Sequence, residues 1–533
     1  MKKCLSAFLF LLLQQFAQQT TFAQNKSGPA TPLEAPQYEK WYPVFLDLYA
    51  SSPAFIDSKG RVKLAFDSIY TLLDKGQAKK NVFEGEYMVL VKSAKSGNDE
   101  YFITDRKGNL KPFPPDIRVV YTSGNRVIVQ QQKLRKMAIW KTDFTPLTPF
   151  KYDFIRPYSE GLATAELDNY YTLIDEQGIE TIPMDHALSS KDSTGDKQTT
   201  YSNTVSEGLV AYAGEGKFGI MDKNGKNKTA PIFDFLEPFH NGMAYAIKKD
   251  TCGYVNKDGK FVLPFNKAHT YITNFSCGLA RARSDDKAFV YYINTKGKMA
   301  FPGRYLSGGD FSNGYAVISN DKTLEKKQII DTHGKVVYEG FFEDAWFGPD
   351  MIVITTETSF AGYTVQTNNY KYLDYNFHTI WQPAADKRII TNLKALPESE
   401  FPGIKHALLG VMNWHYTLKD VEPFLNKAAL VQLRLSVTDR SFVFPPAILK
   451  MTDLEDLDLS YSGLSDIPED IGKLVHLKNL KLDYTNVQHL PESLNLLKDL
   501  QSISVVSTKL SMEEIMAFKQ HLPGVKIIIK ESL

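Results

Sequence analysis

The chain has 533 residues, of which 62 are basic and 61 are acidic. This balance gives no positive field that would attract nucleic acid or an anionic membrane surface, so we expect neither class of partner. A chain of this length exceeds a single core and predicts several units, or one array whose parts contact their neighbours.

The first 23 residues have the pattern of a secretory signal peptide. Lys2 and Lys3 precede an apolar run from Leu5 to Leu13, and small residues end the segment at Ala23. This run is far shorter than the roughly 20 residues that span a bilayer. We therefore expect export to the periplasm, the cell surface or the medium, with no membrane insertion. Residues 24–48 are expected to form a linker.

A glycine followed by alternating apolar and small residues recurs along the first two thirds of the chain. The glycines are Gly161, Gly208, Gly242, Gly278 and Gly314. Their spacing of 34 to 47 residues predicts a repeat architecture. The polar stretch 189–203 falls in the longest interval and is expected to be a surface loop insertion.

Each unit carries a second motif, an Asp or Asn that usually has a glycine three residues later. The Asx side chain can bond its own backbone, and glycine accepts a positive φ, so each copy predicts a hairpin turn. Seven copies are present, at Asp57, Asp105, Asp175, Asp222, Asn256, Asn294 and Asp331. Looser copies of the glycine motif at Gly85, Gly124 and Gly348 extend the array, so residues 49–382 are expected to hold about nine hairpin-bearing units of about 37 residues.

These residues resemble the WG-repeat proteins, bacterial arrays whose unit runs Gly-Leu-Ala, Trp-Gly-Tyr-Ile-Asp, Gly-Lys and a later Pro. Phe218 and Cys252 stand where the family has Trp, and Gly219 and Gly253 keep the adjacent glycine. The resemblance covers about residues 50–380 and implies a binding or scaffolding role without catalytic residues to transfer. Propeller blades usually run about 40 to 45 residues, so the shorter unit slightly favours an open, solenoid-like array over a propeller-like ring.

A different repeat begins at Leu430. Its copies start at Leu430, Leu454, Leu477 and Leu500, and steps of 23 or 24 residues are typical of leucine-rich repeats. We expect a short α/β horseshoe over residues 430–533, closed by a strand at 526–530. A linker and helical cap are expected over residues 383–429.

The position that usually holds asparagine in such repeats carries hydroxyl groups in this chain. We expect these hydroxyls to bond the backbone between successive coils. The residues are Thr438, Ser462, Thr485 and Thr508.

The concave strands of the horseshoe are the predicted partner-binding site. Tyr461 and Tyr484 are 23 residues apart and should stack, and exposed tyrosines are common binding anchors. The alternative is that these are ordinary solvated strand residues. A protein or peptide is the expected partner, with a glycan as the other possibility. The predicted site residues are Arg434, Asp456, Asp458, Tyr461, Lys481, Asp483 and Tyr484.

Metal, cofactor and catalytic motifs are absent from the sequence. One Asp per turn is too few for calcium, and Cys252 and Cys277 have no paired histidines for zinc. The two cysteines could form a disulfide after export or be small buried side chains. We expect a non-enzymatic binding or scaffold protein without cofactors. The alternative is a carbohydrate- or peptide-active enzyme with two close carboxylates in the β array, one of them with a raised pKa.

Overall fold

The computed structural model describes residues 38–530 with several gaps. The predicted signal peptide and most of the predicted linker lie outside the described residues. The gaps are 47–51, 74–81, 94–98, 188, 192–196, 200–203, 215, 250, 267–272, 285–287, 323–325, 356–369, 392, 411–416 and 438–441.

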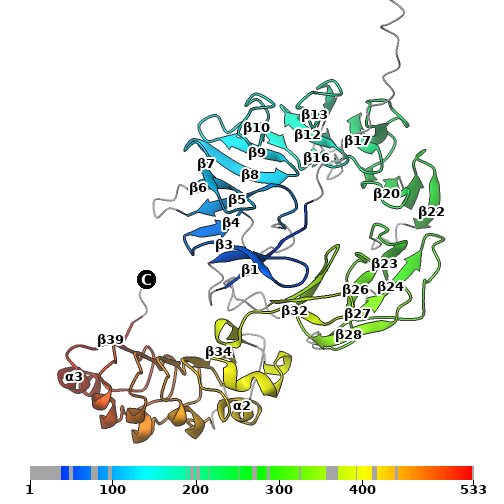
Figure 1. Cartoon of the computed structure of the whole chain (residues 1–533). Helices are drawn as coiled ribbons and strands as arrows, with labels where there is room; N and C mark the ends of the chain where they lie inside the picture. The colour runs from blue at the N-terminus through cyan, green and yellow to red at the C-terminus, as the bar shows by residue number, and fades with distance from the viewer. Residues whose placement is uncertain are drawn as a thin grey trace, which may run out of the picture. The chain divides into compact units, whose positions relative to one another are not determined.

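Small antiparallel sheets follow one another along residues 42–381 (Figure 1). The first sheet holds β1 (Tyr42–Phe45), β2 (Pro53–Ile56) and β3 (Val62–Ala65). The second holds β4 (Tyr70–Leu72), β5 (Tyr87–Lys92), β6 (Glu100–Asp105) and β7 (Leu110–Pro112). The third holds β8 (Ile117–Ser123), β9 (Arg126–Gln131) and β10 (Met137–Lys141). A six-stranded sheet joins two units through β11 (Phe154–Ile155), β12 (Leu162–Leu167), β13 (Tyr170–Asp175), β14 (His186–Ala187), β17 (Leu209–Gly214) and β18 (Lys217–Asp222).

The remaining antiparallel sheets complete this part of the chain. One sheet holds β19 (Phe235–Leu236), β20 (Met243–Lys248), β21 (Thr251–Asn256) and β22 (Phe261–Asn266), and the next holds β23 (Leu279–Arg283) and β24 (Val290–Asn294). A further sheet holds β25 (Ser307–Gly308), β26 (Tyr315–Ser319), β27 (Lys326–Asp331) and β28 (Val336–Phe341). The last holds β29 (Asp344–Phe347), β30 (Ile352–Thr355), β31 (Tyr370–Leu373) and β32 (Thr379–Trp381). The polar stretch expected as a loop contains a small hairpin of β15 (Ser189–Lys191) and β16 (Lys197–Thr199).

The Asx motif forms the expected hairpin turn. At Asp175 the carboxylate accepts hydrogen bonds from the N–H groups of Gln177 and Ile179, both at 2.9 Å, and Gly178 has φ 85°. Two further turns escaped the sequence motif because Phe144 (φ 78°) and Phe377 (φ 65°) replace the glycine, and in the first of them Lys141 also replaces the Asx residue. The same turn begins at residues 57, 105, 141, 175, 222, 256, 294, 331 and 374, so the described chain holds nine units.

Each apolar core lies between two consecutive units, and the last core joins the two ends of the array. Such face-to-face packing buries the apolar face of each small sheet, which no single sheet can bury alone. The closing core combines residues from β1 and β2 with residues near and in the last sheet: Tyr42, Val44, Ala54, Ile56, Met351, Val353 and Tyr372.

The array is therefore a closed, propeller-like ring rather than an open one (Figure 1). The slight preference for an open array was wrong, because unit length does not determine whether the ends pack together. The ring also begins before residue 49, since β1 lies within the segment expected to be a linker.

The residue before each repeat glycine connects neighbouring units. The Glu160 carboxylate accepts hydrogen bonds from the N–H groups of Glu207 (2.5 Å) and Gly208 (2.8 Å), and Glu207 accepts one in turn from Gly242 at 2.9 Å. Asn313 uses its side-chain amide instead, which donates to the carbonyl of Phe347 at 2.8 Å. These linking residues adopt a positive φ, which is uncommon for residues other than glycine.

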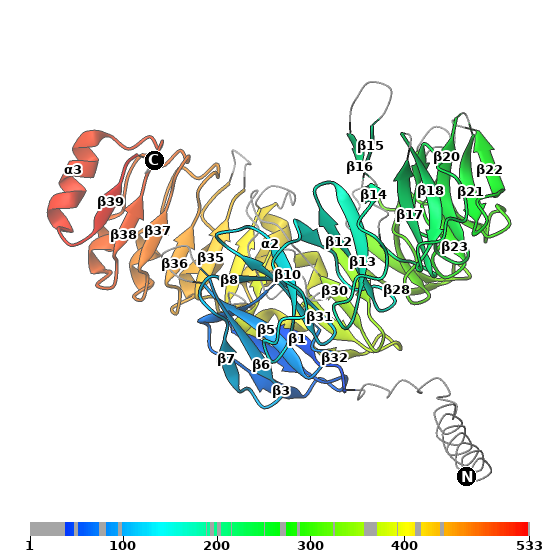
Figure 2. The same cartoon turned by 90° about the horizontal axis from the view of Figure 1, so that it is seen from above.

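A seven-stranded parallel sheet follows the ring in sequence (Figure 2). Its strands are β33 (Ile389–Ile390), β34 (His406–Leu409), β35 (Gln432–Leu435), β36 (Asp456–Asp458), β37 (Asn479–Lys481), β38 (Ser502–Ser504) and β39 (Lys526–Ile528). The connecting segments contain η4 (Ala385–Lys387), η5 (Leu393–Ala395), η6 (Glu398–Gly403), α2 (Leu418–Leu425), η7 (Pro446–Lys450), η8 (Glu469–Lys473), η9 (Glu492–Leu496) and α3 (Met512–His521).

The parallel sheet begins earlier than expected. The segment 383–429, expected to be a linker and helical cap, contributes β33 and β34 to the sheet. Ile404, Ala407 and Leu409 are buried at the spacing later used by leucines, and the Ala in this set hides the pattern. The helix α2 is also present, and its Phe424 is fully buried in the same core. The closing strand appears as β39.

The hydroxyl groups do not link successive coils as expected. Ser462 and Thr485 donate instead to carbonyls of their own coils, Leu459 at 2.6 Å and Leu482 at 2.7 Å. The coils are joined by backbone bonds such as that from Tyr461 N–H to the carbonyl of Asp483 at 2.8 Å. A short hydroxyl side chain reaches the carbonyl three residues back more easily than a neighbouring coil. Thr438 lies outside the described residues.

Candidate partner-binding surface

One face of the parallel sheet points away from the core, and we call it the strand face. In each three-residue strand the middle side chain, such as Leu457 or Leu480, is buried, so its two neighbours point the opposite way. The sheet register therefore aligns Asp456 with Asn479 and Asp458 with Lys481. This register places the predicted charged residues on one face.

Most of these charged side chains bind groups of a neighbouring coil. The Asn479 amide donates to Asp456 at 2.6 Å, and the Arg434 guanidinium lies 3.5 Å from the Asp458 carboxylate. Asp483 accepts hydrogen bonds from the next coil, at 2.8 Å from the N–H of Val506. These side chains connect coils, whereas Lys481 is exposed to solvent.

Tyr461 and Tyr484 form the exposed apolar part of this surface. Their ring centroids are 4.6 Å apart with an interplanar angle of 14°, so the expected stacking is present. Tyr461 is 50 % exposed and Tyr484 is 39 % exposed, which leaves ring edges and a face available to a partner. Both residues adopt a positive φ just after a strand, and Ser507 occupies the equivalent place in the next coil.

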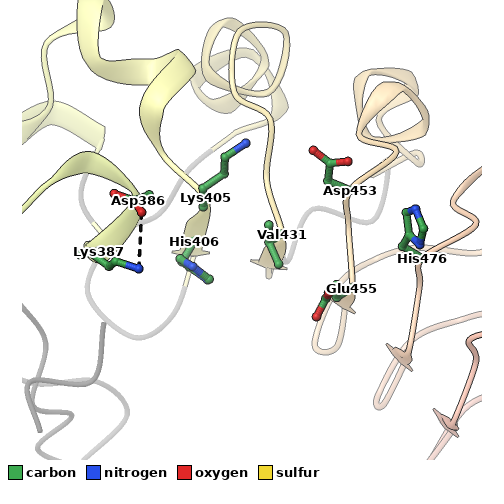
Figure 3. A pocket seen from close by; sticks show the side chains of 8 residues that line it. All are labelled: Asp386, Lys387, Lys405, His406, Val431, Asp453, Glu455 and His476. Atoms are coloured by element: carbon green, nitrogen blue, oxygen red, sulfur yellow. Dashed lines mark ion pairs between the residues drawn. The ribbon is translucent and has the colours of Figure 1, made fainter. Parts of the chain in front are cut away.

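A pocket of about 490 Å³ lies at the other end of the strands, where they begin (Figure 3). Sequence reasoning did not find it, because four of its lining residues lie in the segment 383–429, which was expected to be a linker and helical cap. The Ile404, Ala407 and Leu409 spacing was the signal that could have shown it. The lining residues are Asp386, Lys387, Lys405, His406, Val431, Asp453, Glu455 and His476.

One histidine of this pocket is partly buried. The Nδ1 atom of His406 has no hydrogen-bond partner among the described residues. Burial lowers the pKa of His406 below its ordinary value of 6.5, which favours the neutral form of the ring. A neutral imidazole can donate or accept one hydrogen bond to a ligand.

The other sequence expectations concern metals, cysteines and carboxylates. Within the described ranges, no group of three or more His, Cys, Asp or Glu residues could hold a metal ion. Cys252 is buried, whereas Cys277 is exposed, and neither is in a disulfide. Burial raises the pKa of Glu166, but Arg156 binds its carboxylate at 3.0 Å, so this carboxylate is held in an ion pair. Across the part of the chain that the structure describes, no helix has the length and apolar character needed to cross a bilayer.

Comparison with known proteins identifies repeats in the ring. The family model described as WG containing repeat matches residues 141–171, 218–252, 253–287 and 292–323. No curated protein sequence matches the chain. The chain therefore contains WG repeats, and it is a β-rich repeat protein, consistent with a binding or scaffold role.

Solved structures show only distant likeness. A eukaryotic initiation factor is 10 % identical, with 67 % of this chain and 91 % of that chain covered and a TM-score of 0.31. Hsv2 of Kluyvelomyces marxianus is 10 % identical, with coverages of 57 % and 91 % and a TM-score of 0.25. An LRR protein of Leptospira interrogans is 20 % identical, with coverages of 24 % and 36 % and a TM-score of 0.18. Scores this low assign neither fold nor function.

Proposed function

We propose that this is an exported, non-enzymatic binding protein that recognises a protein or peptide through the strand face of a leucine-rich repeat domain. The stacked, exposed pair of Tyr461 and Tyr484 is the observation that carries the proposal. Tyrosine supplies a large contact area at little conformational cost, and it is enriched at the energetic centres of interfaces. The WG-repeat ring serves as a rigid scaffold or a second surface.

The leucine-rich repeat assignment rests on the repeated sequence and on the sheet register. Leu433, Leu457 and Leu480 are paired in register in neighbouring strands, and all three are buried. Repeats of this kind bury a continuous core only when they stack, which leaves the strand face free for a partner.

Affinity capture from envelope extracts of the source organism tests the binding role. The wild-type protein is expected to retain a partner that the Tyr461→Ala, Tyr484→Ala double variant loses. Tyr170→Ala is the matched control, because Tyr170 is a 45 % exposed tyrosine of the ring and its removal should leave capture intact. A partner captured equally by the double variant would contradict the assignment of this site.

Export and the absence of catalysis have separate tests. Placing charges in the apolar run with the double variant Leu11→Arg, Leu12→Arg is expected to leave the protein in the cytoplasm with residues 1–23 uncleaved.

Turnover of substrates in polysaccharide or peptide panels would instead favour an enzyme. If a variant that lacks residues 395–533 kept this turnover, the active site would lie in the β array.

A further inference from the structure

The pocket at the start of the parallel strands carries opposite charges on its two sides. The backbone N–H of Val431 donates to the carbonyl of Lys405, and the N–H of Glu455 donates to that of Val431, each at 2.8 Å. This ladder aligns Lys405, Val431 and Glu455, which lie immediately before the neighbouring strands β34, β35 and β36, with the apolar residue in the middle. Asp453 lies on the same side as Glu455, across Val431 from Lys405 (Figure 3).

Two of these charges are not neutralised within the described part of the chain. Glu455 forms an ion pair with Lys478 at 2.8 Å, and Lys387 lies 3.5 Å from Asp386. Among the described residues, the side chains of Lys405 and Asp453 take part in no ion pair or hydrogen bond. The pocket thus offers one cation and one anion whose charges are available to a ligand.

The spacing of the strands fixes the separation of the two charged sides. Neighbouring strands lie about 4.8 Å apart, so two strand steps separate the backbones of Lys405 and Glu455 by roughly 10 Å. An extended peptide rises about 3.3 to 3.6 Å per residue, so roughly three residues span that distance. The pocket volume of about 490 Å³ is within the range of small-ligand sites.

We propose that this pocket binds a short extended peptide segment that carries an anion and a cation about 10 Å apart. The anion binds at Lys405, the cation binds at Asp453 and Glu455, and the apolar middle of the segment rests on Val431. The two charges can come from the termini of a free tripeptide or from side chains of a longer chain.

Calorimetry with defined peptides on the full mature chain tests this site and distinguishes the two sources. The probes are free trialanine, trialanine capped at one or both ends, and a doubly capped peptide carrying Lys and Glu three positions apart. Binding of free trialanine that is lost on capping either end supports terminal recognition. Binding of the Lys and Glu peptide alone supports side-chain recognition. No binding of any probe overturns the proposal.

Charge variants locate the binding in the pocket. Lys405→Gln and Asp453→Asn are each expected to lower the affinity for the peptide probe at least tenfold. Lys519→Gln on α3 should leave this affinity unchanged. Far-ultraviolet circular dichroism shows that each variant is folded. If Lys405→Gln binds the probe with the affinity of the wild type, the assignment of peptide binding to this pocket is wrong.

This inference is independent of the partner proposed for the tyrosine pair. Tyr461 and Tyr484 follow the strands, whereas the pocket precedes them, so the double tyrosine variant should bind the probe peptide normally. Loss of partner capture with intact peptide binding, or the reverse result, therefore separates the two proposals.

Discussion

The hydroxyl of Tyr372 donates a hydrogen bond to the carbonyl of Pro43 at 2.5 Å, although 329 residues separate them. Tyr254 and Tyr292 hold the equivalent position in two internal units, and they donate in the same way to the carbonyls of Thr273 and Gly309. The contact that joins the ends of the ring thus uses the same tyrosine position as two internal contacts, although its acceptor lies at a different place, in β1 of the first unit. This hydrogen bond connects the last unit to the first and supports closure of the ring.

Removing this hydroxyl tests closure of the ring. Tyr372→Phe should lower the free energy of unfolding by about 1 kcal/mol, because it deletes one buried hydrogen bond and leaves a carbonyl unpaired. Tyr292→Phe, the internal control, should cost a similar amount in chemical denaturation. A normal stability for Tyr372→Phe together with a loss for Tyr292→Phe would show that the ends do not pack.

A glycine substitution tests the same closure through backbone contact. A Cβ at Gly60 would lie 2.5 Å from the carbonyl oxygen of Ile380, in the last strand of the ring. Gly161 has nearly the same φ, 79° against 77°, but open space around it. Both Ala variants carry the cost of a positive φ, so Gly60→Ala should be less stable than Gly161→Ala by about 1 to 3 kcal/mol. Equal urea midpoints would argue against the contact.

Cys277 occupies a position where other units use Glu or Asn. Its thiol accepts a 3.3 Å bond from the N–H of Gly314 and lies 3.9 Å from the Ser276 hydroxyl, whereas the amide of Asn313 donates to two carbonyls of the next unit at 2.8 and 2.9 Å. Asn also tolerates the positive φ of 53° at this site. Cys277→Asn should therefore raise the melting temperature, by an amount that corresponds to about 0.5 to 1.5 kcal/mol. Cys277→Ala is expected to lower it.

Glu207 links ring stability to pH. Partial burial acts to raise its pKa, but the ion pair with Lys257 at 2.9 Å and the hydrogen bond from Gly242 outweigh burial and hold the pKa below its ordinary value of 4.5. A depressed acid pKa stabilises the fold above the pKa of the unfolded chain, and this stabilisation is lost as the pH falls through the folded value.

Thermal melts from pH 7 to pH 3 test this linkage. Wild type should lose stability below about pH 4.5, where an unfolded glutamate begins to take up protons. Glu207→Gln should be less stable at pH 7 and should lose less on acidification. Parallel pH profiles for the two proteins would show that this carboxylate does not contribute.

Local chemistry made much of the fold predictable. The Asx turns could be predicted because the bonds that form them join residues within five positions, as at Asp175. The stacking of Tyr461 on Tyr484 followed from the regular coil length. The parallel strand β34 was missed because Ala407 fills a place where later coils have leucine.

The sequence by itself determined the repeat unit, its turns and the change of period near Leu430, because each depends on residues that are close in the chain. Tertiary structure alone decided that the ring closes and that Lys405 and Asp453 lie on opposite sides of one pocket. Both depend on side chains from units far apart in sequence, and a local pattern does not record which distant surfaces become neighbours. Packing between units determines which surfaces become neighbours, because it buries the apolar faces that single units leave exposed.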